Sequence, residues 1–322
     1  FSQMEIDTNK YQTKPMNCPF HIMIYKNGLK SYRDLPVKFA EIGTVYRYER
    51  SGVLHGLFRA RGFTQDDAHI FCSLDQIEKE VSDVMDLTIE FLNKFGFSDY
   101  EIYVSTKPKK YVGSDDEWES ATNSLKKSLD NKSLKYSIDD GGGAFYGPKI
   151  DLKIKDVLGR LWQCSTVQVD FNLPKRFDLE YISSNNQRLQ PVMIHRAIFG
   201  SFERFFGILI EHYGGAFPTW LSPYQIRLLT VSDEQVDFAN EVADNLKSNN
   251  LRVYLDLRNE KLGLKIRESE ISKVPFIGII GNNESENKTI NIRRYGGEQI
   301  GEIKIDELVK LICGDTSKEV VS

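Results

Sequence analysis

A glycine pair and two prolines divide this chain of 322 residues into two parts with different hydrophobic patterns. They lie within residues 214–223, after a long apolar stretch and before a new stretch of strand type. Glycine and proline interrupt helices and strands, so such a cluster is typical of a connection between domains. We predict one domain over residues 1–216, a linker over 217–223 and a second domain over 224–322.

The first part carries short apolar stretches of strand type, with helical stretches between them. Residues 37–50 and 62–71 are predicted to form two strands joined by a glycine-containing loop. Ser73 and Gln76 form a capping box, which predicts a helix that runs to Gly96. Further strands are expected at 100–104, 150–154 and 161–171, and a helix over 195–213. Strands joined by hairpins favour an α+β domain with a mainly antiparallel sheet flanked by helices.

Strands and helices alternate in the second part. Strands are expected at 225–231, 253–257, 276–280 and 289–293, and helices at 233–249, 260–273 and 305–313. Alternation at this spacing is typical of βαβ units, so this part is predicted to form a small α/β domain with a mixed or parallel sheet.

Composition and charge narrow the class of protein. With 40% hydrophobic and 27% charged residues and no apolar run of membrane length, we expect a soluble globular protein without a membrane partner. The four cysteines are far apart, which disfavours a secreted disulfide framework and indicates the cytosol or an organelle. The net charge of −4 disfavours a uniformly basic nucleic-acid-binding surface but allows local basic patches.

Polar side chains follow the two predicted strands at 37–50 and 62–71. Alternate residues of a strand share a face, so Arg47 and Glu49 are expected to project together. One face of the second strand gathers Phe63, Gln65, Asp67 and His69. This row suits the floor of a binding site, and an exposed, solvated sheet face would explain it as well. Arg204 stands among apolar residues, where an arginine is more often ion-paired than bound to an anion.

The pattern Arg-x-Glu at 47–49, with Gly-x-x-x-Arg at 200–204, resembles motifs 2 and 3 of the class II aminoacyl-tRNA synthetases. Longer segments resemble the threonyl-tRNA synthetases of that class: 14–19, 61–71, 145–149, 162–168 and 194–197. The resemblance runs from about Met16 to the end of the chain, and Phe20 departs from it where glycine is expected. We expect this chain to lack the start of the family's catalytic domain, its small amino-terminal domain and its editing domain.

The resemblance implies an ATP site built on arginines. Arg47 would bind the α-phosphate of ATP, Arg204 the γ-phosphate and Arg59 the polyphosphate tail, with Mg²⁺ accompanying the nucleotide. Guanidinium suits this task because it stays charged and offers a planar fork of donors to phosphate oxygens. Phe63 would stack on adenine, and Glu49 would read its amino edge.

Four further residues are implied near the threonine and the adenylate: Gln65, Tyr146, Lys149 and Gln163, the last of these also near ATP. The implied reaction is attack of the threonine carboxylate on the α-phosphate, with pyrophosphate leaving. It needs no side-chain nucleophile, because positioning and charge stabilisation do most of the work. Gln65 and Lys149 therefore join Arg47 and Arg204 as candidate catalytic residues.

The most distinctive implication is one zinc ion per chain, bound by Cys18, His69 and His195. These residues come from separate segments, and each alone reads as an ordinary buried cysteine or histidine. Three protein ligands leave a position open, as in catalytic zinc sites. In the family the ion would bind the amino and hydroxyl groups of threonine, which disfavours valine. Asp67 would accept the hydrogen bond of the hydroxyl group.

The second domain resembles the anticodon-binding domain of class II synthetases. Asn259, Glu284 and Arg293 are implied to read anticodon bases of tRNA(Thr), although such residues are also ordinary loop polars. Residues 28–37 resemble motif 1, through which class II enzymes pair, so a homodimer is expected.

Two rival functions come from other classes. A catalytically silent RNA-binding relative is disfavoured because the motif arginines and the three candidate ligands are intact. A zinc hydrolase is disfavoured because the sequence contains no His-Glu-x-x-His motif. Prolyl- and seryl-specific enzymes are the near neighbours within the class, and metal content would separate the zinc-free ones.

Overall fold

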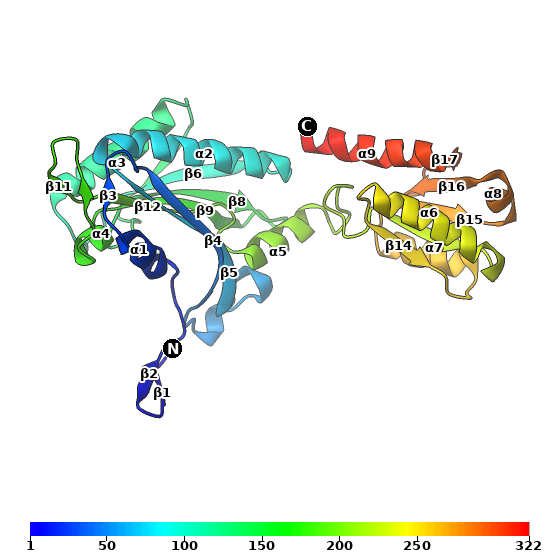
Figure 1. Cartoon of the computed structure of the whole chain (residues 1–322), viewed down its shortest axis with the longest axis horizontal. Helices are drawn as coiled ribbons and strands as arrows, with labels where there is room; N and C mark the ends of the chain where they lie inside the picture. The colour runs from blue at the N-terminus through cyan, green and yellow to red at the C-terminus, as the bar shows by residue number, and fades with distance from the viewer. Residues whose placement is uncertain (322) are drawn as a thin grey trace. The chain divides into compact units, whose positions relative to one another are not determined.

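The computed structural model describes residues 1–321, with the side chains of residues 1–316. The chain forms two compact units, Phe1–Leu209 and Ile210–Ser322, and each is built on a main sheet of its own (Figure 1). Among the described residues, no helix combines the length and the apolar character needed to cross a membrane.

The first unit contains a seven-stranded sheet with the order β4-β5-β12-β9-β8-β6-β7. Its strands are β4 (Val37–Tyr46), β5 (Gly62–Cys72), β6 (Tyr100–Ser105), β7 (Ser137–Asp139), β8 (Lys149–Lys155), β9 (Leu161–Asp170) and β12 (Val192–Ala197). Neighbouring strands are antiparallel except for β6 and β7. The predicted mainly antiparallel sheet is therefore confirmed.

Helices cover both faces of this sheet. They are α1 (Cys18–Lys26), α2 (Ile77–Lys94), α3 (Asp115–Asp130), α4 (Asn172–Arg176) and α5 (Phe202–His212). Short strands form two further small sheets: β1 (Met4–Ile6), β2 (Asn9–Tyr11), β3 (Lys30–Ser31), β10 (Tyr181–Ile182) and β11 (Arg188–Leu189). In Figure 1, α2 and α3 run along one side of the sheet and α1 lies on the other.

The alternation of the strands places α1 beside the candidate metal ligands. Phe71 of β5 and Met193 of β12 belong to one apolar cluster with Tyr25 of α1, whose ring stacks on Phe71 at a centroid distance of 4.5 Å. His69 and His195 lie two residues away on the same strands, so they share this face. Packing of α1 on the sheet thus brings its first turn close to both histidines.

Two sequence predictions need correction. The helix predicted over 195–213 is wrong in its first part, because His195 lies on strand β12 and α5 begins only at Phe202. A short apolar run, such as the first part of this segment, fits a buried strand as well as a helix. Gly200 ends the run with a φ of +70°, and a Cβ atom there would lie 2.5 Å from the Cys164 carbonyl oxygen. The strand predicted over 37–50 ends at Tyr46, so Arg47 and Glu49 follow it without belonging to it.

Of two helix capping boxes in this unit, the one before α2 was predicted from the sequence and the one at α3 was not. Ser73 and Gln76 form the predicted capping box, at the start of a 3₁₀ turn that leads into α2. Ser114 and Glu117 form a second box at the start of α3, a helix that the sequence analysis did not predict. Helix α1 was also missed, because it has only nine residues and carries apolar side chains on its exposed side as well as on its buried side, which hides the helical period.

The second unit is built on a five-stranded sheet with the order β14-β13-β15-β16-β17. Its elements are β13 (Ile226–Thr230), α6 (Val236–Ser248), β14 (Val253–Asp256), α7 (Leu262–Ile271), β15 (Phe276–Ile280), α8 (Asn282–Asn287), β16 (Thr289–Arg294), β17 (Gln299–Lys304) and α9 (Ile305–Val321). Strands β14, β13 and β15 are parallel, whereas β16 and β17 are antiparallel. The predicted α/β domain is confirmed, and β17 and α8 are additions to it.

Candidate active site and metal centre

A cavity of about 590 Å³ lies on the α1 side of the seven-stranded sheet. Thirteen residues that the sequence analysis proposed for this part of the chain line it together: Cys18, Arg47, Glu49, Arg59, Phe63, Gln65, Asp67, His69, Tyr146, Lys149, Gln163, His195 and Arg204. They come from α1, from four strands of the sheet, from α5 and from the loops between them. The fold therefore assembles one polar site from distant segments.

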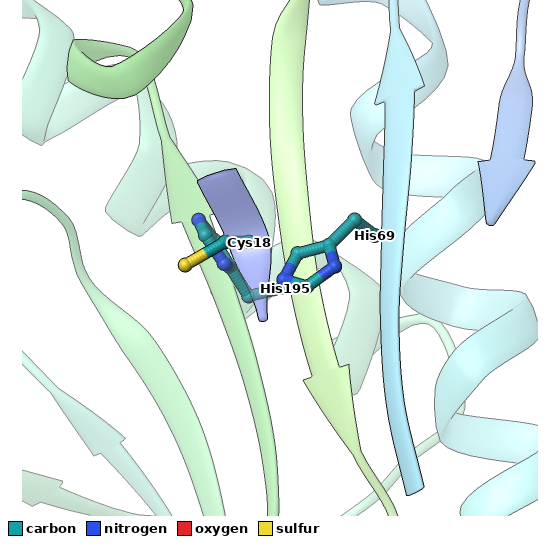
Figure 2. A group of neighbouring side chains, drawn as sticks. All are labelled: Cys18, His69 and His195. Atoms are coloured by element: carbon teal, nitrogen blue, oxygen red, sulfur yellow. The ribbon is translucent and has the colours of Figure 1, made fainter. Parts of the chain in front are cut away.

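Cys18, His69 and His195 meet at one end of this cavity. One potential ligand atom from each lies within 4.8 Å of the other two. His195 is the direct cross-strand neighbour of His69 in the β12–β5 ladder, with ring centroids 4.8 Å apart. Cys18 is the buried first residue of α1, and Figure 2 shows it beside the two strands that carry the histidines.

This donor set fits a zinc ion. Thiolate sulfur and imidazole nitrogen are preferred zinc ligands with bonds of about 2.0–2.3 Å, which places ligand atoms about 3.5 Å apart around a tetrahedral ion. The observed separations, all within 4.8 Å, need only small side-chain shifts to reach that geometry. His195 Nε2 also lies 3.0 Å from a carboxylate oxygen of buried Asp170, and such a contact typically orients a metal-binding histidine.

His21 was not among the residues predicted for the site. It is buried, and its Nδ1 atom lies 2.7 Å from Nδ1 of His69. Its Nε2 atom lies 3.4 Å from a carboxylate oxygen of Glu41 on β4. Residues three apart share a helix face, so His21 follows Cys18 toward the sheet. This spacing would have identified it if α1 had been predicted.

The two candidate histidine ligands differ in their electrostatic environment. Burial, together with the nearby His195 and His21, lowers the pKa of His69 far below its usual range. Burial also disfavours the charged form of His195, but hydrogen bonds with Asp170 and Cys18 outweigh it and raise the pKa of His195 to about 10. In the metal-free protein, His69 therefore presents a free lone pair, whereas His195 holds a proton that a metal ion would displace.

Asp67 is held next to the ligand cluster. Its Oδ2 atom accepts a hydrogen bond of 3.0 Å from the side-chain amide of Asn17, and its Oδ1 atom lies 3.6 Å from His69 Nε2. Burial raises the pKa of Asp67. A Cβ atom at Gly43 would lie 2.5 Å from the Asn17 amide nitrogen, so glycine on β4 makes room for this contact. Asn17 was not among the residues predicted for the site.

Arg204 is fixed by two backbone carbonyl groups. Its Nε atom donates to the Phe58 oxygen at 2.8 Å, and a terminal nitrogen donates to the Gln163 oxygen at 2.7 Å. Burial lowers the pKa of Arg204, although guanidinium remains charged at any physiological pH. The group also lies 5.6 Å from the centroid of the Trp162 ring. This arrangement leaves the remaining terminal nitrogen of Arg204 for a bound anion.

Two further arginines lie in the same cavity. The Arg47 guanidinium lies 5.2 Å from the Phe63 ring centroid and donates to the Pro15 carbonyl oxygen at 3.1 Å. Arg59 donates to a carboxylate oxygen of Glu49 at 3.1 Å. Three permanently charged groups at one cavity favour a polyanionic ligand such as a nucleoside triphosphate.

Three of the four residues proposed for threonine and the adenylate lie on β5, β8 and β9, and Tyr146 lies in the turn before β8. Gln65 donates to the Gly200 carbonyl oxygen at 3.2 Å. The Tyr146 ring lies 5.8 Å from that of His195, and burial raises the pKa of its hydroxyl group. Lys149 and Gln163 both donate to the buried carboxylate of Asp151, which the sequence analysis did not single out.

The residues proposed for anticodon reading lie in the second unit. Asn259 is exposed in the segment between β14 and α7. Glu284 uses a carboxylate oxygen to accept the Gly281 amide at 2.9 Å, at the start of α8. A terminal nitrogen of Arg293 on β16 lies 3.4 Å from a carboxylate oxygen of Glu270.

Comparison with known proteins identifies the family. Residues 3–213 match the family described as tRNA synthetase class II core domain (G, H, P, S and T), and residues 225–313 match the anticodon binding domain family. The chain belongs to the class II aminoacyl-tRNA synthetases, as a catalytic core followed by an anticodon-binding domain.

Within that class the chain matches threonyl enzymes. It is 53% identical over its whole length to the threonine–tRNA ligase of Sulfurihydrogenibium sp., and 56% identical over 97% of its length to the chloroplastic/mitochondrial threonine–tRNA ligase 2 of Arabidopsis thaliana. The chain spans about half the length of each of these curated relatives.

Solved structures of aminoacyl-tRNA synthetases also match this chain. A structure of the RNA-binding domain of threonyl-tRNA synthetase from Cryptosporidium parvum has a TM-score of 0.91 and 38% identity, with 97% of this chain and 78% of that chain covered. A prolyl-tRNA synthetase from the same organism, bound to L-proline and AMP, shares the fold at 17% identity and a TM-score of 0.71 over 96% of this chain and 59% of that one.

Proposed function

We propose that this chain activates threonine with ATP and transfers it to the 3′ end of tRNA(Thr). The single observation that carries the proposal is the shared cavity, in which the candidate metal ligands lie at one end and three arginines line the rest. The first group suits a small ligand with amino and hydroxyl groups, and the second suits a polyphosphate. The names of the relatives agree with this combination.

In the first step a carboxylate oxygen of threonine attacks the α-phosphorus of ATP, and the bond to the β-phosphate oxygen breaks as pyrophosphate leaves. Arg47 is proposed to hold the α-phosphate, and Arg204 and Arg59 the γ-phosphate and the tail. Phe63 would stack on adenine, and Glu49 would accept from its amino group after exchanging its contact with Arg59. Lys149 and Gln65 would stabilise the reacting groups electrostatically. Mg²⁺ would arrive with ATP.

In the second step a hydroxyl group of the terminal adenosine of tRNA attacks the threonyl carbonyl carbon, and AMP leaves. Tyr146, Gln65 and Gln163 are proposed to hold the aminoacyl group for this transfer. Their positions beside His195 and Lys149 support that role.

Cys18, His69 and His195 are proposed to hold one zinc ion per chain. When bound, the ion would offer open coordination positions to the amino and hydroxyl groups of the amino acid. Asp67 would then accept the hydrogen bond of the substrate hydroxyl group, a role that its fixed position beside His69 supports. Valine lacks that hydroxyl group and would leave this hydrogen bond to Asp67 unmade, which disfavours it strongly.

The remaining proposals concern partners and organisation. Residues 1–216 are proposed as the catalytic domain and 224–322 as the anticodon-binding domain, in which Asn259, Glu284 and Arg293 contact the anticodon. A homodimer is proposed through the motif 1 segment at 28–37. The preceding helix α1 supports it, because this helix leaves three large apolar side chains exposed: Phe20, Met23 and Ile24. The cytosol or an organelle is proposed as the compartment, and the name of the Arabidopsis relative fits the second choice.

Threonine-dependent exchange of pyrophosphate into ATP, with metal analysis of the same sample, tests the proposal. We expect about one zinc ion per chain and exchange that requires threonine. Cys18→Ser should lose both, whereas Cys313→Ser, at an exposed cysteine of α9, should keep both. Absence of threonine-dependent exchange in zinc-loaded protein would reject the activity. Full exchange in zinc-free Cys18→Ser would reject the role of the metal.

A further inference from the structure

The buried carboxylate of Asp151 on β8 is the meeting point of four side chains. Its exposed fraction is only 2%, and both of its oxygens accept hydrogen bonds. Oδ1 accepts from Gln163 Nε2 at 2.7 Å and from the Thr166 hydroxyl at 2.9 Å. Oδ2 accepts from Lys149 Nζ at 2.5 Å, and the Ser105 hydroxyl, whose hydrogen it shares with Asp139, lies 3.4 Å away. Three of these donors, Lys149, Gln163 and Thr166, line the candidate active site, whereas Asp151 does not.

A β-bulge explains how these side chains reach one carboxylate. The β8–β9 register shifts between Leu152 and Lys153. In a regular strand, Gln163 and Thr166 would point to opposite faces because they are three residues apart. The extra residue of the bulge returns both to the face of Asp151, and their side chains are 2.7 Å apart. Bulges beside active sites commonly re-aim side chains in this way.

The carboxylate also fixes the direction of the hydrogen bonds. An ionised carboxylate only accepts, so Gln163 must turn its amide nitrogen toward Asp151. The same nitrogen donates to the Thr166 hydroxyl, and that hydroxyl uses its own hydrogen for Asp151. Both amide hydrogens of Gln163 are therefore engaged within the protein. What Gln163 has left for a ligand is its carbonyl oxygen, an acceptor.

We propose that Asp151 is a positioning residue that turns Gln163 into an acceptor-only contact and holds the Lys149 ammonium beside it. The ligand group that meets Gln163 must then be a hydrogen-bond donor, such as an ammonium or hydroxyl group, while Lys149 meets a negatively charged one. This inference rests on the proposed function for the identity of the ligand, but the orientation of Gln163 does not depend on it.

Kinetics provide the first test. Asp151→Asn keeps one acceptor oxygen, which the donor-only ammonium of Lys149 takes, so the new amide nitrogen faces Gln163. The Gln163 amide then reverses and presents donors to the cavity. We expect threonine-dependent exchange to lose about 10²-fold in kcat/KM, the scale that misplacement of a contact group by about 1 Å produces. Glu80→Gln is the matched control, since Glu80 is also a buried carboxylate paired with a lysine but lies on α2 outside the cavity. It should keep wild-type kcat/KM at a similar cost in stability.

A double-mutant comparison separates positioning from a general structural effect. In a Gln163→Met background, the loss caused by Asp151→Asn should shrink to the part exerted through Lys149, because the contact with Gln163 is already gone. An equal loss in both backgrounds would overturn the proposal.

A second measurement does not depend on activity. The side-chain amide protons of Gln163 can be identified in ¹⁵N NMR spectra as the pair that disappears in Gln163→Met. We expect them to exchange slowly with solvent in the wild type and rapidly in Asp151→Asn, with Glu80→Gln unchanged. If the Gln163 amide protons exchanged with solvent at the same rate in Asp151→Asn and in the wild type, the positioning role would be overturned. This outcome does not depend on whether the protein catalyses pyrophosphate exchange. Slow amide exchange without pyrophosphate exchange would instead reject the proposed function and keep the role of Asp151.

Discussion

The Nδ1 atoms of His21 and His69 lie 2.7 Å apart, and His21 continues this contact to Glu41 through its other ring nitrogen, at 3.4 Å. The side chains of Glu41, His21 and His69 thus form a chain of contacts that ends at a candidate metal ligand. Such outer partners fix the orientation and basicity of a histidine ligand. We therefore predict that His21 acts on the proposed metal centre without belonging to its ligand set.

Substitution His21→Phe tests this chain. The ring volume is retained, but the contact to His69 Nδ1 is lost, so zinc affinity should fall about 10–100-fold. Competition with a chromophoric chelator measures the affinity directly. His212→Phe, at an exposed histidine of α5, serves as the control and should bind zinc like the wild type. Equal affinity of His21→Phe and wild type would contradict the prediction.

Zinc affinity should depend on pH. The metal-free protein holds a proton on His195, whose pKa is raised to about 10, and that proton must leave before a metal ion binds. Because His195 is protonated throughout the range from pH 6 to 8, this group alone should strengthen apparent zinc affinity about tenfold per pH unit as pH rises. The same chelator competition at pH 6, 7 and 8 measures the slope, and an affinity that is flat or falls with pH would be inconsistent with the proposed ligand.

Substrate selection should fail more readily for serine than for valine. Serine keeps the hydroxyl group and lacks one methyl group, a difference of about 1–3 kcal/mol, so it should support measurable pyrophosphate exchange. Valine should be rejected by about 10⁴-fold or more. Asp67→Asn should narrow the gap between threonine and valine, because the fixed acceptor is weakened. Exchange with all three amino acids in both proteins gives the comparison, and negligible activity with serine would argue against the proposed pocket.

Arg204→Lys keeps the charge but loses the planar fork that bridges Phe58, Gln163 and the cavity. We expect exchange to fall about 10²-fold, because a lysine cannot satisfy both carbonyl groups and still reach a phosphate. Arg160→Lys, at a surface arginine paired with Asp156, is the control and should change the rate less than twofold. A small effect of Arg204→Lys, similar to that of Arg160→Lys, would remove Arg204 from the proposed phosphate site.

Acid should destabilise the second unit through Asp256. Hydrogen bonds from Arg258 and Arg227 outweigh burial and hold the pKa of this carboxyl far below its usual range. The folded-state pKa lies below the unfolded value of about 3.9, so the stabilisation is complete above about pH 4 and is lost as pH falls further. Asp256→Asn should cost about 3 kcal/mol at pH 7 and weaken the acid dependence. Hydrogen exchange of the β13 and β14 amides at pH 7 and below 4 reports this loss, and an unchanged profile would contradict it.

Sequence reasoning went furthest where a pattern is local. Alternation alone placed Gln65, Asp67 and His69 on one face of β5, and the capping box at Ser73 marked the approach to α2. The mainly antiparallel sheet followed from hairpins, which are also local. The resemblance to a family added Cys18 and His195 to His69 as candidate metal ligands. Their spacing in the sequence does not indicate a shared site.

The remaining features depend on long-range register. Nothing in the apolar run around His195 indicates that it pairs with β5 rather than continuing as a helix, and that pairing sets His195 opposite His69. Asp151 reads as an ordinary strand residue until the bulge in the β8–β9 ladder is known. Asp170 and His21 likewise gain their roles only from contacts with residues far away in the chain.

The candidate ligands extend from the first turn of α1 to β12, which has a consequence for biosynthesis. On the ribosome, Cys18 and His69 emerge well before His195, so a growing chain can offer only two of the three donors until β12 has been made and has joined the sheet. Under the proposed function, metal capture is therefore a late step of maturation. A chain translated without zinc would keep a proton on His195 in place of the ion.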